Sequence, residues 1–190
     1  MKQYVKTVVD KMNNSLELFM MTYMDLNHVA AIHRGLNSWV DARAATFEFS
    51  HSGSFQLAPF NLRAPKQSMY KYYHLAWLRH AGVNPNFGAK WYATYPYGMI
   101  EEYPGIIVES DIKMCEGMCI NTLVFYATTP DPFLTEAAID AYMETAEEDK
   151  VATENLQFDS DHNTRGPGTF HPILPSGVHH WKKWMANRTP

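Results

Sequence analysis

Apolar side chains near the start of the chain recur every three or four positions, from Val5 through Leu16 to Tyr23. This spacing is typical of an amphipathic helix and predicts one over residues 3 to about 24. A similar step continues beyond this range, with Gly35 as a natural place for the helix to stop.

Two pairs of segments predict antiparallel hairpins. Residues 44–50 and 54–58 alternate apolar with polar side chains on either side of a short polar turn. Residues 105–113 and 118–128 are rich in β-branched and aromatic side chains, and they meet at a turn that contains Gly117. Both pairs therefore predict strands joined by tight turns.

Helices are predicted over residues 66–81 and 134–148, the second after the Pro-rich turn that ends at Pro132. A short strand is expected at 90–94 and a further strand at 151–158. The pattern indicates an α+β fold: an N-terminal amphipathic helix, and antiparallel hairpins packed against two helices.

The composition changes after residue 158, where Asp, Asn, Gly, Pro and His become frequent. We therefore expect a single domain over 1–158 and an extended C-terminal arm over 159–190. The arm ends in a short segment with Trp181 and Trp184, which are costly to leave in water and should dock on this chain or a neighbour.

The composition favours a folded, soluble protein. The 190 residues are 46% hydrophobic, 14% aromatic and 19% charged, which argues against disorder. Charged or amide residues interrupt every apolar stretch, so no membrane span or signal peptide is expected. No catalytic signature is evident, and enzymatic activity is left open, with the balance leaning against it.

Two cysteines, Cys115 and Cys119, are too few for a disulfide scaffold and fit a reducing compartment. Whether they pair depends on the turn between them. A three-residue loop would place them opposite each other, and a two-residue loop would place them on opposite faces of the hairpin.

Charge is divided into blocks along the chain. Residues 1–100 carry a balance of +5, residues 101–161 carry −13 and residues 162–190 carry +4. Blocks of opposite sign can attract the next copy of a subunit, so they favour head-to-tail self-association. The basic residues form no dense run, which makes direct reading of DNA or RNA sequence unlikely.

Histidines suggest two possible metal sites, and neither is favoured. A set at the start of the arm is the runner-up for a metal and comprises Asp159, Asp161, His162 and His171. His28 and His33 are five residues apart, which on one helix places them some 140° apart, so they should not chelate one ion. We therefore expect no metal ligands, no catalytic residues and no cofactor.

Nine tyrosines and tryptophans lie between Tyr70 and Tyr103. Such a tract can line a ligand pocket, but aromatic side chains also anchor protein interfaces, and we favour core or interface. The residues predicted for an interface combine this tract, the arm and the acidic helix: Trp91, Tyr95, Tyr97, Trp181, Trp184, Glu144, Glu147 and Glu148.

Three short motifs resemble the tail-terminator and neck proteins of tailed bacteriophages. They are YPGIIV at 103–108, LVFY at 123–126, and PDP at 130–132 with the following helix that contains Ala138, Tyr142, Met143 and Glu144. The resemblance, with the N-terminal helix, covers about 70 residues. It implies a homo-oligomeric ring at the head-to-tail connection, without catalysis.

The leading hypothesis is therefore a structural assembly subunit of a phage virion, with other virion proteins as partners. The virion is then its location, and otherwise the cytoplasm. The alternative is a small-ligand-binding protein or a metal-dependent enzyme, which would use the aromatic tract at 70–103 and the His/Asp arm.

Overall fold

Seven strands form one antiparallel sheet. The computed structural model describes residues 2–61, 68–80, 88–162 and 177–188. The strands are β1 (Gln3–Met12), β2 (Thr46–Ser50), β3 (Gly53–Pro59), β4 (Gly88–Thr94), β5 (Gly98–Tyr103), β6 (Ile106–Cys115) and β7 (Met118–Ala127). Their order across the sheet is β1-β7-β6-β5-β4-β3-β2, so β1 is the only strand out of sequence order.

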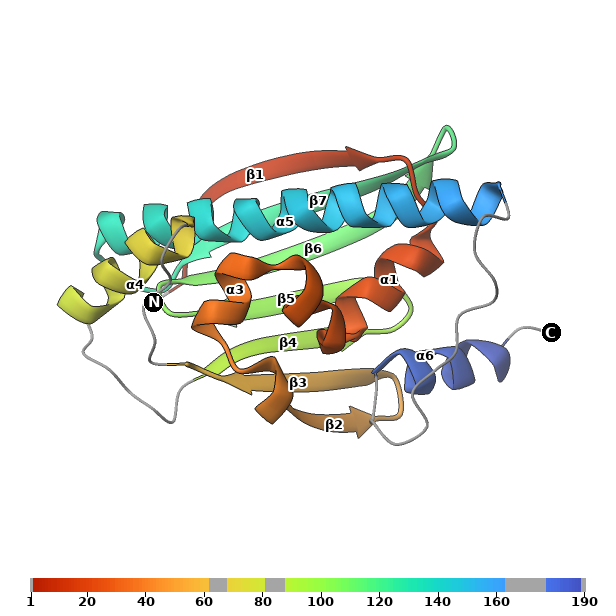
Figure 1. Ribbon diagram of the computed structural model, residues 1–190, viewed down its shortest axis with the longest axis horizontal. Helices are drawn as coiled ribbons and strands as arrows, with labels where there is room; N and C mark the ends of the chain where they lie inside the picture. The colour runs from red at the N-terminus through yellow and green to blue at the C-terminus, as the bar shows by residue number, and fades with distance from the viewer. Residues whose placement is uncertain (1, 62–67, 81–87, 163–176, 189–190) are drawn as a thin grey trace.

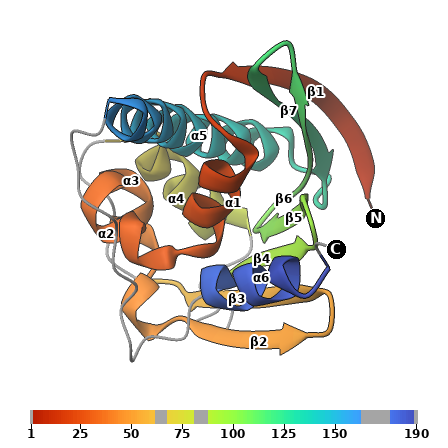
Figure 2. The ribbon, with the colours of Figure 1, turned by 90° about the vertical axis from the view of Figure 1, so that its right-hand side faces the viewer.

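The helices gather on one side of this curved sheet (Figures 1 and 2). They are α1 (Leu16–Met24), α2 (Val29–Ile32), α3 (Arg34–Trp39), α4 (Met69–His80), α5 (Pro132–Asp161) and α6 (Gly177–Ala186), with 3-10 turns η1 (Leu26–His28) and η2 (Ala42–Ala44). The long α5 runs along the β6–β7 side (Figure 1). The chain is thus α+β, as the sequence predicts.

The prediction of a helix over residues 3–24 is wrong for its first half. Residues 3–12 form β1, which pairs antiparallel with β7. Val5, Thr7, Val8 and Val9 are β-branched and favour a strand, and the long-range pairing outweighs the helical spacing. The helix begins only at Leu16, after Ser15, whose hydroxyl accepts a hydrogen bond from the backbone N–H of Leu18 at 3.2 Å.

Both predicted hairpins are present. β2 pairs with β3 and β6 with β7, in registers that leave two-residue turns. The second turn consists of Glu116 and Gly117, and it places Cys115 in solvent and Cys119 in the interior. Both thiols are free, which is the outcome expected of a two-residue loop.

The strand predicted at 151–158 is absent, because α5 continues without a break to Asp161. Its start matches the prediction: Asp131 accepts a hydrogen bond from the Phe133 N–H at 2.9 Å, and Pro132 occupies the first turn, where its missing N–H costs nothing. One helix of 30 residues therefore carries side chains to both ends of the sheet.

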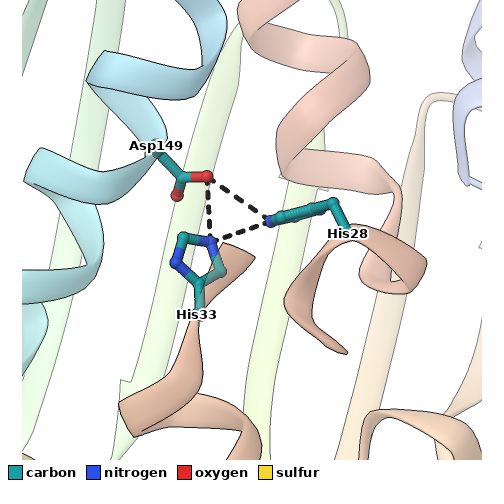
Figure 3. A group of neighbouring side chains, drawn as sticks. All are labelled: His28, His33 and Asp149. Carbon is teal, nitrogen blue, oxygen red and sulfur yellow. Dashed lines mark hydrogen bonds and ion pairs between the residues drawn. The ribbon is translucent and has the colours of Figure 1, made fainter. Parts of the chain in front are cut away.

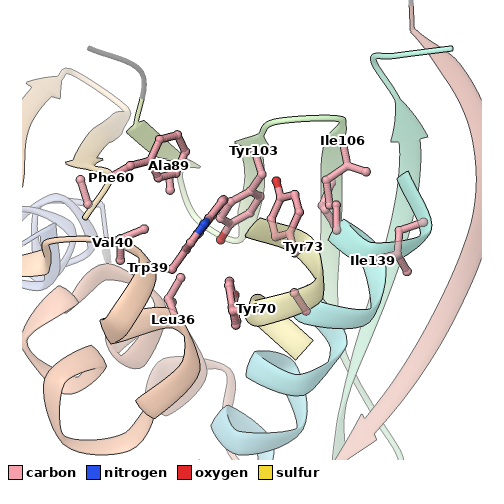
Figure 4. Packing of buried hydrophobic residues seen from close by; sticks show 14 of the residues in the cluster. Leu36, Trp39, Val40, Phe60, Tyr70, Tyr73, Ala89, Tyr103, Ile106 and Ile139 are labelled. Carbon is pink, nitrogen blue, oxygen red and sulfur yellow. The ribbon is translucent and has the colours of Figure 1, made fainter. Parts of the chain in front are cut away.

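The main core lies between the sheet and the helices α3, α4 and α5. Trp39 is fully buried at its centre (Figure 4). Its ring lies within 6.5 Å of those of Phe60, Tyr70, Tyr73, Trp77 and Tyr103. Much of the tyrosine-rich tract is thus used to build the core beside the site described below.

The C-terminal helix α6 packs against α1, β2 and β3. Trp181 is buried there, and its indole N–H donates to the backbone carbonyl of Pro96 at 3.0 Å. Residues 163–176 of the predicted arm lie outside the described residues. None of the described helices is long and apolar enough to cross a membrane.

Candidate metal centre and adjoining cavity

Two breaks in the helical chain bring His28 and His33 together. Asp25 ends α1 and caps η1, where its carboxylate accepts from the Asn27 N–H at 3.0 Å. His33 separates α2 from α3 with φ −96° and ψ 82°, which is not helical. The expectation that these histidines point apart was wrong, because it assumed one continuous helix, and their Nε2 atoms lie 3.0 Å apart.

Asp149 on α5 completes the group (Figure 3). One carboxylate oxygen lies 3.0 Å from Nε2 of His33 and 3.4 Å from Nε2 of His28. Three ligands on one face of an octahedral ion, each about 2.1 Å from it, are separated from one another by about 3.0 Å. The spacing of the three atoms therefore fits a common metal ion.

Neighbouring groups orient both imidazole rings. Nδ1 of His28 contacts the backbone carbonyl of Asp25, and Nδ1 of His33 lies 2.8 Å from a carboxylate oxygen of Glu148. Each Nδ1 therefore carries the proton that it donates, which leaves each Nε2 with a lone pair in the neutral ring. Two such lone pairs and a carboxylate oxygen converge on one point, an arrangement that needs a cation.

The electrostatics agree with this conclusion. Burial opposes the charge on Asp149, but in the absence of a metal ion the protonated forms of His28 and His33 donate hydrogen bonds to it, which outweighs burial and holds its pKa at about 2. Burial also lowers the pKa of His33, yet Asp149 and Glu148 more than offset that effect and raise it above 6.5. The centre thus favours positive charge, and a divalent ion can take the place of a proton.

The donor set identifies the class of metal. Two imidazoles and one carboxylate on one face of an ion leave other positions open, and this set is typical of non-haem iron(II) centres that react with oxygen. Among the described residues, this is the only group of three or more His, Cys, Asp or Glu side chains positioned to share an ion.

A cavity of about 60 Å³ adjoins the centre. Its wall includes all three candidate ligands and also Glu101 on β5. The alternation of β5 directs Met99, Glu101 and Tyr103 toward the helices. The remaining lining residues are mostly apolar or aromatic and include Met12, Phe19, Tyr23, Leu26, Val29, Leu36, Trp91 and Tyr142.

The side chains predicted for the runner-up metal site do not form one in the described part of the chain. Asp161 accepts from the Gln157 amide at 2.8 Å, and Nδ1 of His162 lies 2.8 Å from the Phe158 carbonyl. Asp159 lies on the same last turns of α5, whereas His171 falls outside the described residues.

The residues predicted for an interface are distributed over several environments. Trp91 lines the cavity, and Tyr95 and Tyr97 pack against the cluster that contains Trp181. The ring of Trp184 lies 5.5 Å from that of Tyr95.

The three glutamates of that prediction lie on α5. Glu144 accepts from the backbone N–H of Met69 at 2.6 Å, Glu147 is exposed, and Glu148 orients His33. An interface role for these residues stays a prediction. No local signal in the sequence marks Asp149 as a ligand, because its histidine partner His33 lies 116 residues away.

Solved structures of other proteins share this fold. The chain shares its fold with a quaternary ammonium Rieske monooxygenase, CntA, solved with an inhibitor (TM-score 0.74, 13% identity, 98% of this chain and 49% of that one). It also matches dicamba monooxygenase bound to 3,6-dichlorosalicylic acid (TM-score 0.65, 14% identity, 98% and 58%). At this level of identity the likeness concerns the fold.

Two curated relatives are named putrescine 2-hydroxylase. The chain is 31% identical to the one from Ralstonia nicotianae over 180 residues, or 87% of this chain and 49% of the relative. It is 28% identical to the one from Bordetella bronchiseptica over 190 residues, or 93% and 44%. The chain thus spans about half the length of these relatives. No protein-family model matches it.

These comparisons overturn the phage interpretation. Neither the relatives nor the solved structures named above are tail-terminator or neck proteins, so the resemblance of the three short motifs was misleading. The predicted virion subunit, its ring of virion proteins and its location in the virion are therefore wrong. The comparisons agree better with the alternative of a metal-dependent enzyme.

Proposed function

We propose that this chain is the catalytic part of a Rieske-type oxygenase, in which His28, His33 and Asp149 hold one iron(II) ion. The observation that carries this proposal is the convergence of three ligand atoms within 3.0 to 3.4 Å of one another. The shared fold and the two hydroxylase relatives support it.

The reaction class is insertion of one oxygen atom into a C–H bond. A substrate C–H, O₂, two electrons and two protons give an alcohol and one water molecule. When bound, the iron supplies the activation of O₂. The protein's own residues hold that ion, fix the imidazole tautomers through Glu148 and the Asp25 carbonyl, and place the substrate in the adjoining cavity.

Electrons must reach the site from another centre. A Rieske cluster needs two cysteines and two histidines, and the hairpin sends Cys115 and Cys119 to opposite faces of the sheet. Within the described residues there is no such ligand set. We therefore propose that a redox cluster on a separate domain or chain is the electron donor.

An amine is the substrate class that the comparisons favour. The two curated relatives are named for putrescine, a linear diamine, and one structural neighbour is a quaternary ammonium monooxygenase. The substrates in these names are those of the relatives and the structural neighbour. For this chain, we propose hydroxylation of a small aliphatic amine.

Hydrogen peroxide provides a test that does not require the electron donor, because it supplies both the oxygen atom and the oxidising equivalents: R–H and H₂O₂ give R–OH and water. Iron-loaded protein is mixed with putrescine and peroxide, and the product is measured by mass spectrometry. We expect hydroxylated diamine from the unaltered chain and from His162→Ala, and none from Asp149→Ala. Equal yields from the unaltered chain and Asp149→Ala would refute the proposal.

A further inference from the structure

A buried carboxylate that belongs to none of the three candidate metal ligands also lines the cavity. Glu101 is only 5% exposed, and its oxygens accept hydrogen bonds from the hydroxyls of Tyr103 and Tyr142, both at 2.7 Å. A carboxylate has about four acceptor sites in all. These two bonds, together with one from Trp91, leave it able to accept a further donor from a ligand in the cavity.

No basic side chain neutralises this carboxylate within the described part of the chain. The adjacent Glu102 is paired with Lys90 at 2.9 Å, whereas the bonded partners of Glu101 are the phenols of Tyr103 and Tyr142 and the indole of Trp91, all of them uncharged. Burial raises the pKa of Glu101 to about 7, although hydrogen bonds from Tyr103, Tyr142 and Trp91 partly oppose that effect. A buried acid without a cationic partner is costly to ionise unless a ligand brings the positive charge.

Aromatic side chains surround Glu101. The rings of Trp91 and Tyr103 meet edge to face at a centroid distance of 5.8 Å, and those of Tyr103 and Tyr142 at 6.1 Å. Tyr23 also lines the wall. Electron-rich ring faces attract ammonium groups, which favours a cationic ligand over a neutral one.

The charge of the cavity wall points the same way. Besides Glu101 and Asp149, the wall includes Asp10, and among the described residues no lysine or arginine lines it. Lys150 neutralises Asp10 at 3.0 Å, so Glu101 is the lining carboxylate that has neither a lysine partner nor a place at the metal centre. A small cation is therefore drawn to it.

The dimensions of the cavity suit a small ligand. Tyr142, which bonds Glu101, and Asp149 lie seven residues apart on α5, which corresponds to roughly 10 Å along the helix axis. Thr145 and Ala146 also line the wall. A single water needs roughly 10 to 15 Å³, so the cavity of about 60 Å³ has room for a short aliphatic chain and for little more.

We propose that Glu101 binds the ammonium group of an aliphatic amine substrate, with Tyr103 and Tyr142 holding the carboxylate in place. A carbon a few bonds from the nitrogen then faces His28, His33 and Asp149. This assignment rests on the proposed oxygenase function, because the bound amine is a substrate only if the chain is an oxygenase. Amine binding itself can be measured without turnover.

The test compares binding of three probes by isothermal titration calorimetry: putrescine, butylamine and 1-butanol. The proteins are the unaltered chain, Glu101→Gln, and Glu102→Gln as a matched control on the neighbouring residue. We expect Glu101→Gln to weaken binding of both amines by roughly 10- to 100-fold, the range for a hydrogen bond to a charged group. The affinity for 1-butanol should be the same in all three proteins. Glu102→Gln should bind both amines as tightly as the unaltered chain does.

Equal amine affinity in Glu101→Gln and the unaltered chain would overturn the assignment, and so would an equal loss for 1-butanol. If Glu101→Gln does not fold by circular dichroism, Tyr142→Phe replaces it, with an expected loss of roughly 3- to 10-fold for amines; an unchanged affinity would then overturn the assignment. Iron content is measured in parallel. A chain that binds amines through Glu101 but holds no iron would refute the oxygenase and leave the ammonium site standing.

Discussion

Replacing Glu101 by Gln should change how the stability of the protein depends on pH. The carboxyl is buried, and its pKa of about 7 lies well above the ordinary value of 4.5. The folded protein therefore holds this proton in a pH range where the unfolded chain has released it. Because the folded state binds more protons, its stability falls as pH rises through that range.

The magnitude follows from the two pKa values. A pKa difference of one unit corresponds to about 1.4 kcal/mol, so the full loss is about 3 kcal/mol, most of which falls between pH 5 and pH 8.5. By pH 8.5 the loss is nearly complete. Gln does not titrate, so the difference between the two proteins isolates the contribution of Glu101.

The tyrosines around Glu101 and the carboxylate of Asp149 do not change their charge between pH 5 and pH 8.5. Tyr103 and Tyr142 carry pKa values raised well above 10 by burial, as does Tyr23. Asp149, with a pKa of about 2, stays charged throughout. His33 lines the same cavity and titrates with a pKa raised above 6.5, but His33 is present in both proteins, so its contribution cancels in the difference between them.

The assay is urea unfolding followed by tryptophan fluorescence at pH 5 and pH 8.5, with equal metal content and no amine. The free energy of unfolding of the unaltered chain, minus that of Glu101→Gln, should fall by roughly 2 to 3 kcal/mol between these values. Adding putrescine at pH 8.5 should restore part of this lost difference, because the amine binds only the folded form and binds the unaltered chain more tightly than Glu101→Gln. A difference that stays constant, or that rises with pH, would refute the reasoning.

Three further predictions concern positioning and packing. Glu148→Ala should weaken iron binding by roughly 10- to 100-fold in a metal titration, because Glu148 orients the ring of His33. Glu147→Ala, which changes the exposed neighbouring residue, should leave iron binding unchanged in the same titration. Trp39→Ala should lower the free energy of unfolding by roughly 3 to 5 kcal/mol in a urea titration, because the side chain is fully buried among five aromatic rings. Ser15→Ala should cost about 1 kcal/mol in the same assay by removing the cap of α1.

Local signals in the sequence were sufficient for the hairpins and for the start of α5. Alternating side chains and the turn at Glu116 and Gly117 determine β6 and β7 without reference to the rest of the chain. The N-terminal strand could not be predicted in this way, because its position depends on pairing with β7, more than 100 residues later. Helical spacing in β1 is a local pattern that tertiary contacts override.

The metal centre could not be predicted from the sequence, because it too depends on contacts between distant parts of the chain. Five-residue spacing excludes a shared ion only if the intervening residues stay helical, and non-helical backbone at His33 removes that condition. Asp149 comes from a helix that packs against this segment only in the folded protein. The buried state of Glu101 was equally invisible, since Glu101 and Glu102 look alike in the sequence and differ only in the face of β5 that they occupy.

The central claim is that His28, His33 and Asp149 bind one iron ion, and anaerobic iron(II) titration tests it most directly. The unaltered chain and His162→Ala should each bind one equivalent, whereas His28→Ala, His33→Ala and Asp149→Ala should each lose that binding while keeping their fold by circular dichroism. Failure of the unaltered chain to bind iron, or undiminished binding in Asp149→Ala, would contradict the claim.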